Sequence, residues 1–189
     1  MFARSFLRTP ALHTLKAQPV FRLARFQSTY KLNPASIVST HSGAAPKLYF
    51  TTEHEWIALH EDGAAFIGIT NYAADALGDA TFIDLPADRV EESIPRGEVI
   101  SSIESVKSAS DVYSPVLGSI KAVNEALDEA PELINKDPMG EGWIVKVQVE
   151  EPANVEGLME AEEYEKFVES AEHWVILYDF TSFNSFFIH

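Results

Sequence analysis

The stretch IESVKSASDVYSPV, residues Ile103 to Val116, contains a single lysine, Lys107, between two runs with the composition of β-strands. These runs, RGEVISSIESV and SDVYSPVLGSIKAVN, predict a β-hairpin with Lys107 at its turn. Most lysines at turns are simply surface residues. The small side chains beside this one also fit a lysine whose ε-amine is displayed for acylation by an enzyme. The spacing alone leaves both interpretations open.

The body of the chain outside this hairpin predicts the same kind of fold. Short strand-like runs separated by Gly and Pro turns alternate with a few short helices, which favours a small β-sandwich or flattened barrel. An Asp-Gly pair at 62–63 predicts a hairpin, and Thr70 or Asn71 is expected to begin a helix that ends at Gly78. The strands are expected in 47–70, 80–86, 96–106, 110–124 and 142–150, and the helices in 71–78, 129–135 and 153–171.

The charges of the 189-residue chain are distributed unevenly. All 29 acidic residues occur at or after Glu53, whereas seven of the 14 Lys and Arg residues precede it. An acid-free, arginine-bearing N-terminus is typical of a mitochondrial transit peptide, which we place at residues 1–28. The alternative is a basic tail that binds nucleic acid or anionic lipid. We further expect a linker at 29–46, one domain at 47–172 and an atypical aromatic tail at 173–189.

The composition also argues against several classes of function. The chain has no cysteine, which removes disulfides, thiolate metal sites and a cysteine nucleophile. The acidic body argues against nucleic acid as a partner, and no apolar run is long enough for a transmembrane helix. HEWIALH lacks the i, i+4 histidine spacing of a zinc helix, so no metal site is expected. No nucleophile signature occurs, and the body does not look like an enzyme.

Several motifs together resemble the glycine cleavage H-protein family. They are SSIESVKSASDVYSPVLGSIKAVNEAL, PELIN, GWIVKVQV and, upstream, TTEHEWI and FIGITNYAADALGDATFIDLP, which cover about Leu48 to Glu169. Biotinyl domains have Met on both sides of the lysine, where this chain has Val106 and Ser108. The resemblance implies a mainly β, lipoyl/biotinyl-like sandwich with short helices and a C-terminal helix.

The resemblance also implies a cofactor and a set of site residues. Lys107 would carry lipoate in amide linkage. Acidic side chains of an arm cleft would be Glu55 and Asp111. The lipoyl-attaching enzyme would recognise the residues that flank the lysine, namely Glu104, Ser105, Val106 and Ser108. Two departures from the family pattern are Glu53, where some relatives have Ser, and Met139, where many have Tyr.

The function that the resemblance implies is that of a non-catalytic carrier in the mitochondrial matrix. Lipoyl-Lys107 would take an aminomethyl group from glycine decarboxylase (the P protein) to the tetrahydrofolate-dependent aminomethyltransferase (the T protein). Dihydrolipoyl dehydrogenase (the L protein) would then reoxidise it. Two alternatives remain: a relay that donates lipoyl groups to 2-oxo acid dehydrogenase complexes, and an unmodified interaction module. The module predicts that Lys107→Arg leaves every function intact.

Overall fold

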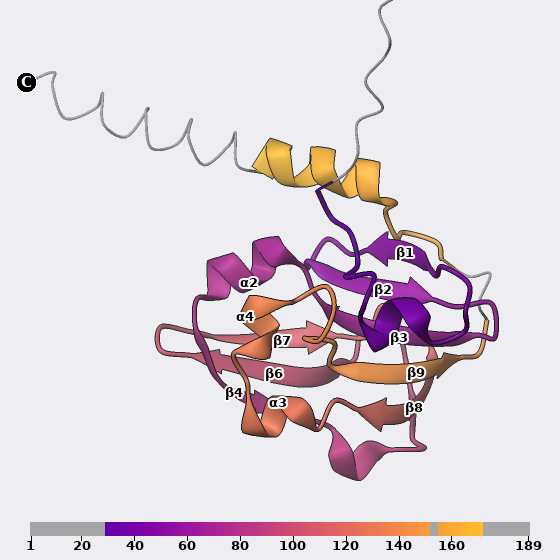
Figure 1. The fold of residues 1–189 in the computed structure, drawn as a ribbon, viewed down its shortest axis with the longest axis horizontal. Coiled ribbons are helices and arrows are strands. Elements are labelled where there is room, and N and C mark those ends of the chain that lie inside the picture. The colour runs from indigo at the N-terminus through magenta and orange to yellow at the C-terminus, as the bar shows by residue number, and fades with distance from the viewer. Residues whose placement is uncertain (1–28, 152–154, 172–189) are drawn as a thin grey trace, which may run out of the picture.

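The computed structural model describes residues 29–151 and 155–171, which form two antiparallel sheets and several short helices (Figure 1). The six-stranded sheet has the order β1 (Lys47–Phe50), β2 (Glu55–Leu59), β3 (Ala64–Ile69), β9 (Val145–Val149), β8 (Gly118–Val123), β5 (Ser93–Ile94). The three-stranded sheet has the order β4 (Ala80–Asp84), β6 (Val99–Ser105), β7 (Ala109–Tyr113). The helices are α1 (Ile37–Thr40), α2 (Asn71–Leu77), η1 (Ala87–Arg89), α3 (Ala126–Glu129), α4 (Leu133–Lys136) and a helix at 161–171.

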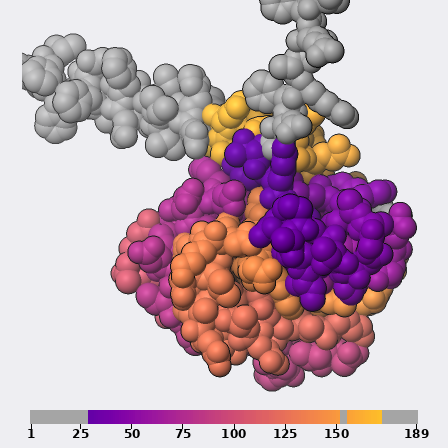
Figure 2. Space-filling view, in the orientation of Figure 1, coloured from indigo at the N-terminus to yellow at the C-terminus, as the bar shows by residue number. Residues whose placement is uncertain are grey.

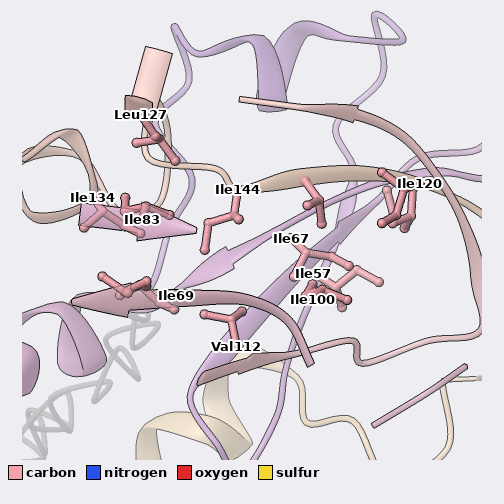
Figure 3. Packing of buried hydrophobic residues seen from close by; sticks show 14 of the residues in the cluster. Ile57, Ile67, Ile69, Ile83, Ile100, Val112, Ile120, Leu127, Ile134 and Ile144 are labelled. Carbon is pink, nitrogen blue, oxygen red and sulfur yellow. The ribbon is translucent and has the colours of Figure 1, made fainter. Parts of the chain in front are cut away.

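The two sheets enclose one apolar core, so the predicted β-sandwich is confirmed. Ile57 and Ile67 of the larger sheet belong to the same buried cluster as Ile100 and Val112 of the smaller sheet (Figure 3). Each of these four side chains is at most 2% exposed. Burying such branched residues contributes about 1.5–3 kcal/mol each, which makes this cluster the main source of stability for the sandwich.

Strands β2 and β3 are buried on both faces, which explains why their sequences contain so few polar residues. One set of their side chains enters the core between the sheets. The other set, which includes Trp56 and Phe66, forms a second cluster on the opposite face of the larger sheet. Tyr164 and Val168, one helical turn apart, bring the helix at 161–171 onto this second cluster, beside β1 in Figure 1.

The C-terminal helix is shorter than predicted. The sequence pattern suggested a helix over 153–171, but the described helix begins at residue 161. Gly157 has a φ of 73°, and Met159 forms a β-bridge with Phe50, with reciprocal backbone hydrogen bonds of 2.9 Å. This extended contact with β1 uses backbone groups that a longer helix would need for itself.

Residues 29–46, which we expected to form a linker, are instead packed against the domain. They include helix α1, and Val38 within it is fully buried in the second cluster. Asn33 donates from its backbone N to the carbonyl of Met139 at 2.9 Å and from its side chain to Asp137 at 2.7 Å. Figure 2 shows this indigo segment lying across the purple and orange parts of the surface. The Ser-, Ala- and Pro-rich composition of this segment suggested a linker, but a few of its apolar side chains, such as Val38, pack against the domain.

The predicted transit peptide at 1–28 and the aromatic tail at 173–189 lie outside the described residues. Within the described ranges, none of the helices has the length and apolar composition needed to cross a bilayer.

Candidate functional site

Lys107 lies at the exposed tip of the hairpin that joins β6 to β7. The backbone N of Ser105 donates to the carbonyl of Ser108 at 2.8 Å and closes the turn. The Ser105 hydroxyl accepts from the backbone N of Lys107 at 3.2 Å and of Ser108 at 3.1 Å. Val106, beside the lysine, is 82% exposed. Ser105 therefore fixes a turn that projects the lysine beyond the sheet.

The lysine side chain extends over Gly78, the residue that ends α2. A methyl group built on Gly78 would lie 3.2 Å from Cε of Lys107, and the φ of Gly78 is 79°. Asn135 of α4 fixes this loop with two hydrogen bonds. Its side chain donates to the carbonyl of Gly78 and accepts from the backbone N of Ala80, both at 2.9 Å. A glycine at this position thus leaves room for the lysine side chain to pass over the loop.

Glu104 and Asp111 lie on the outward face of the three-stranded sheet. Glu104 pairs across the strands with Phe82 and Ala109, and Asp111 pairs with Ser102. Both carboxylates are exposed, whereas Val112, the next residue along β7, is buried in the core. This alternation places the acidic side chains on the exposed face of the sheet.

Glu55 occupies a different environment at the start of β2. It is 1% exposed, and its Oε1 accepts a hydrogen bond of 3.0 Å from the backbone N of Tyr113, at the end of β7. Its Oε2 accepts a hydrogen bond from the hydroxyl of Thr51. Burial raises the pKa of Glu55, and the hydrogen bonds from Thr51 and Tyr113 partly counteract that rise.

A pocket of about 370 Å³ lies beside Glu55. Its lining comes from three separate segments and includes Glu53, Glu55, Arg96 and Tyr113. The guanidinium of Arg96 is held at one side, where Nη1 donates to the carbonyl of Glu156 at 2.7 Å. The pocket therefore combines a buried carboxylate, an exposed carboxylate and a fixed cation.

The structure brings together only some of the residues that the sequence singled out. Lys107 and its flanking residues form one turn, as the local sequence predicts. Asp111 does not line the pocket of Glu55, and it lies on β7 between Lys107 and the pocket. From Lys107 to Tyr113 the strand covers about 20 Å, at a rise of about 3.4 Å per residue. A long arm on Lys107 that followed β7 would thus pass Asp111 before it reached Glu55.

Sequence reasoning missed the residues whose role depends on distant partners. Gly78 was expected only as the end of a helix, and Asn135 only as part of one. Neither Arg96 nor Tyr113 was considered, and no local motif marks them. The outward orientation of Phe82 depends on a register shift in β4, which the sequence does not reveal.

Comparison with known proteins places this geometry in a family. The sequence model of the glycine cleavage H-protein family matches residues 48–171. The chain belongs to the glycine cleavage H-protein family. A mitochondrial glycine cleavage system H protein from Saccharomyces cerevisiae is 47% identical over 165 residues, which cover 85% of this chain and 96% of the yeast protein. The H protein of Thermotoga maritima is 48% identical over 118 residues, which cover 62% of this chain and 93% of that protein.

A solved structure supports the same assignment. The crystal structure of a glycine cleavage system H protein from Mycobacterium marinum has a TM-score of 0.57 with this chain at 38% identity. The match covers 63% of this chain and 94% of the mycobacterial chain. The H-protein family is thus shown by sequence and by fold, and its extent coincides with the sandwich and the helix at 161–171.

The site has the chemistry that a family of lipoyl carriers requires. A covalent arm needs an accessible amine, which the exposed turn at Lys107 supplies. It also needs a place where a charged end group can be held away from water, which the buried carboxylate of Glu55 beside its pocket supplies. The residues present therefore fit a lipoyl group attached at Lys107.

Proposed function

We propose that this protein is the lipoyl carrier of a glycine cleavage system, with the lipoyl group in amide linkage on Lys107. Membership of the glycine cleavage H-protein family supports a role as a carrier component, and we propose that the chain is not a catalyst of the system. The observation that supports the choice of residue is the exposed β6–β7 turn, where Ser105 fixes the backbone and Lys107 extends into solvent. When bound, the lipoyl group supplies two sulfur atoms that accept the aminomethyl group derived from glycine and exchange two electrons.

The residues around Lys107 present and guide the arm. The Ser105 hydroxyl holds the turn, so the ε-amine is offered to an enzyme at one position. Glu104, Val106 and Ser108 are exposed beside it and form the recognition surface for the lipoyl-attaching enzyme. The exposed Asp111 lies farther along β7 on the way to the pocket.

Glu55 and its pocket hold the charged end of the loaded arm. An ammonium that enters the pocket would meet a carboxylate already held by Thr51 and Tyr113, so no reorganisation of the carboxylate is needed. Low exposure to water strengthens that interaction and protects a group that water would hydrolyse. Glu53, at the pocket rim, adds a further negative charge.

The partners and the compartment follow from the family. We infer that the chain acts with glycine decarboxylase, the aminomethyltransferase, dihydrolipoyl dehydrogenase and a lipoyl-attaching enzyme. The name of the yeast relative supports a mitochondrial location, and we propose the matrix for this chain. We place the carrier domain at 47–172, the transit peptide at 1–28 and the aromatic tail at 173–189.

Mass spectrometry of the protein isolated from mitochondria tests the proposal. An acylated lysine has no positive charge for trypsin, so cleavage after Lys107 should fail and the peptide from Gly97 to Lys121 should carry one lipoyl mass. Lys107→Arg keeps the charge and should abolish the modification. Glycine decarboxylase should then load the modified protein with an aminomethyl group. A Lys107 that is always bare and cleaved would overturn the proposal, and lipoylation without loading would point to a lipoate relay.

A further inference from the structure

The outward face of the three-stranded sheet bears an exposed aromatic side chain close to Lys107. Phe82 of β4 is 53% exposed and pairs across the strands with Glu104, three residues before the lysine. Side chains paired in this way have Cβ atoms about 4.5–5.5 Å apart, so the Phe82 ring and the Glu104 carboxylate are neighbours. Val106, 82% exposed, follows at the hairpin tip.

A register shift turns Phe82 to the outside. Ala80 and Ile83 of β4 are both buried, although strict alternation would put residues three apart on opposite faces. The pairing of β4 with β6 shifts between Ala80 and Phe82, and the hydroxyl of Thr81 donates to the carbonyl of Glu104 at 3.1 Å within this irregularity. Such bulges re-aim side chains, and here the result is an aromatic ring in solvent.

The charged side chains of strands β4, β6 and β7 are all acidic. Glu104, Asp84 and Asp111 are exposed there, and strands β4, β6 and β7 contain no lysine or arginine. An apolar patch of Phe82 and Val106 bordered by carboxylates matches a partner that presents an apolar recess surrounded by basic residues.

The chemistry at Lys107 decides which partner this is. The enzymes that act on a lipoyl group work at the far end of a long arm and need not touch the sheet. The enzyme that attaches the group must bring an activated lipoyl carbonyl to Nζ itself. There the Nζ–C bond forms, the bond from that carbon to the phosphate oxygen of the adenylate breaks and AMP leaves. The lysine ammonium gives up two protons to bases, one before attack and one as the amide forms, and Nζ keeps one hydrogen. Its contact surface must therefore include the immediate surroundings of the lysine.

We propose that the outward face of β4, β6 and β7 is the docking surface for the lipoyl-attaching enzyme, with Phe82 as its apolar anchor. This inference rests on the proposed function, because it assumes that Lys107 receives the lipoyl group. Interface energy concentrates in a few large side chains, often aromatic, that enter a pocket on the partner. Phe82 is the exposed aromatic residue of these three strands, whereas Tyr113 at the end of β7 is half-buried. Glu104, Asp84 and Asp111 orient the approach.

The test compares lipoylation of the unmodified full-length chain and its variants by a purified lipoyl-attaching enzyme with lipoate and ATP. Phe82→Thr removes the ring and retains a residue that favours β-strands. We expect kcat/KM to fall about tenfold, mainly through KM, as for the loss of an interface anchor. The affinity of the unmodified chain for the enzyme without lipoate should fall by the same factor. Phe82→Tyr should restore most of both.

Leu117→Thr is the matched control, since Leu117 is 42% exposed and lies in the segment between β7 and β8, away from the hairpin tip. It should be lipoylated like the wild-type chain. Equal rates and affinities for Phe82→Thr and wild type would overturn the docking surface and leave the proposed function intact. If the enzyme modifies a separate lipoyl domain and adds no lipoyl mass to the wild-type Lys107, the proposed function itself fails. A Glu104→Gln variant gives an independent check, with a lower kcat/KM and a weaker dependence on salt.

Discussion

Glu55 is a carboxylate in a place where the fold would be more stable without a charge. It is the first residue of a strand that is buried on both faces, and burial raises its pKa. Thr51 and Tyr113 satisfy its oxygens with hydrogen bonds, but neither supplies a positive charge. A buried carboxylate held by neutral donors can still interact with a cation, which is the role that we propose for Glu55. The protein thus gives up some stability for this side chain, as functional sites commonly do.

Glu55→Gln should stabilise the unmodified protein at pH 7. The pKa of Glu55 is higher in the folded than in the unfolded chain, so the stability that its protonation contributes is fully present below the ordinary carboxyl pKa of 4.5 and is lost as pH rises through the folded pKa. Gln is neutral throughout and can still accept from Tyr113 and donate to Thr51. Urea unfolding should show a higher midpoint for the variant at pH 7 and a difference that shrinks as pH falls towards about 4.5. The slope attributable to one proton is at most about 1.4 kcal/mol per pH unit.

Glu53→Gln is the control for this prediction. Glu53 is exposed at the rim of the same pocket, and its charge is the smallest of the causes that raise the pKa of Glu55, so its replacement changes the charge of the site and leaves the burial of Glu55 in place. Its pH dependence should follow that of the wild type. If Glu55→Gln were less stable than wild type at pH 7, the hydrogen bonds of the carboxylate would outweigh its burial.

At the scale of elements, helix α1 is held by one buried histidine at the end of β2. His60 is 2% exposed, and its Nε2 contacts the carbonyl of Val38 at 2.9 Å while its Nδ1 contacts the hydroxyl of Ser42 at 2.8 Å. Burial lowers the pKa of His60; nearby His41 and Lys146 lower it further, while Asp62 and the Val38 carbonyl oppose the shift. The neutral ring donates to Val38, within the helix, and accepts from Ser42, just after its C-terminal end, so it holds α1 against the end of β2.

Acidification should therefore loosen α1 before the sandwich. A pKa below that of the unfolded histidine, 6.5, means that the stabilisation is present above pH 6.5 and is lost as pH falls through the folded pKa. Hydrogen-exchange protection of the Ser39 and Thr40 amides should fall by at most about tenfold per pH unit, the limit for one proton. Protection within β2 and β3 should change less. His60→Gln should remove this dependence and His41→Gln should retain it, whereas equal loss in α1 and the strands would contradict a local clamp.

The elements that the sequence predicted correctly are those whose signals are local. Thr70 accepts from the backbone N of Ala73 and begins α2, and Gly78 ends it with a positive φ. The alternation of 142–150 matches β9. The prediction for the N-terminal segment was wrong because that segment is ordered by distant residues. The outward orientation of Phe82 was not predicted, because it depends on a bulge that breaks the alternation. Local propensity contains no information on either.

At the scale of the whole molecule, the candidate site too could be predicted only where its residues are close together in the sequence. Lys107 and its flanking residues lie in one turn and were predicted from one motif with the help of a family resemblance. The contact of Glu55 with Tyr113 joins residues 58 positions apart, and it depends on how the two sheets stack. Gly78 meets Lys107, and Asn135 bonds to Gly78, because α2, α4 and the β6–β7 hairpin come together at one end of the sandwich. Tertiary packing, and not a local pattern, assembles the pocket.

The net charge of −15 predicts how salt affects the stability of the whole protein. Like charges on a compact body repel one another, and salt relieves that repulsion as the Debye length falls from about 30 Å at 0.01 M to about 8 Å at 0.15 M. The ion pairs that salt would weaken in the described residues are surface contacts such as Lys121–Glu91 and Lys136–Glu132, worth at most about 1 kcal/mol each. We therefore expect NaCl to raise the urea midpoint of the full-length chain over this range.

A charge variant on the helix at 161–171 gives this prediction its control. Glu162, Glu163 and Glu169 are exposed on that helix, and a triple replacement by Gln removes three of the negative charges without touching a buried side chain. At low salt the variant should unfold at a higher urea concentration than the wild type, and the two curves should converge as NaCl is added. A midpoint that falls with salt in the wild type would mean that the surface ion pairs outweigh the repulsion. The excess of acidic residues would then stabilise the fold through specific contacts, and not oppose it as the net charge implies.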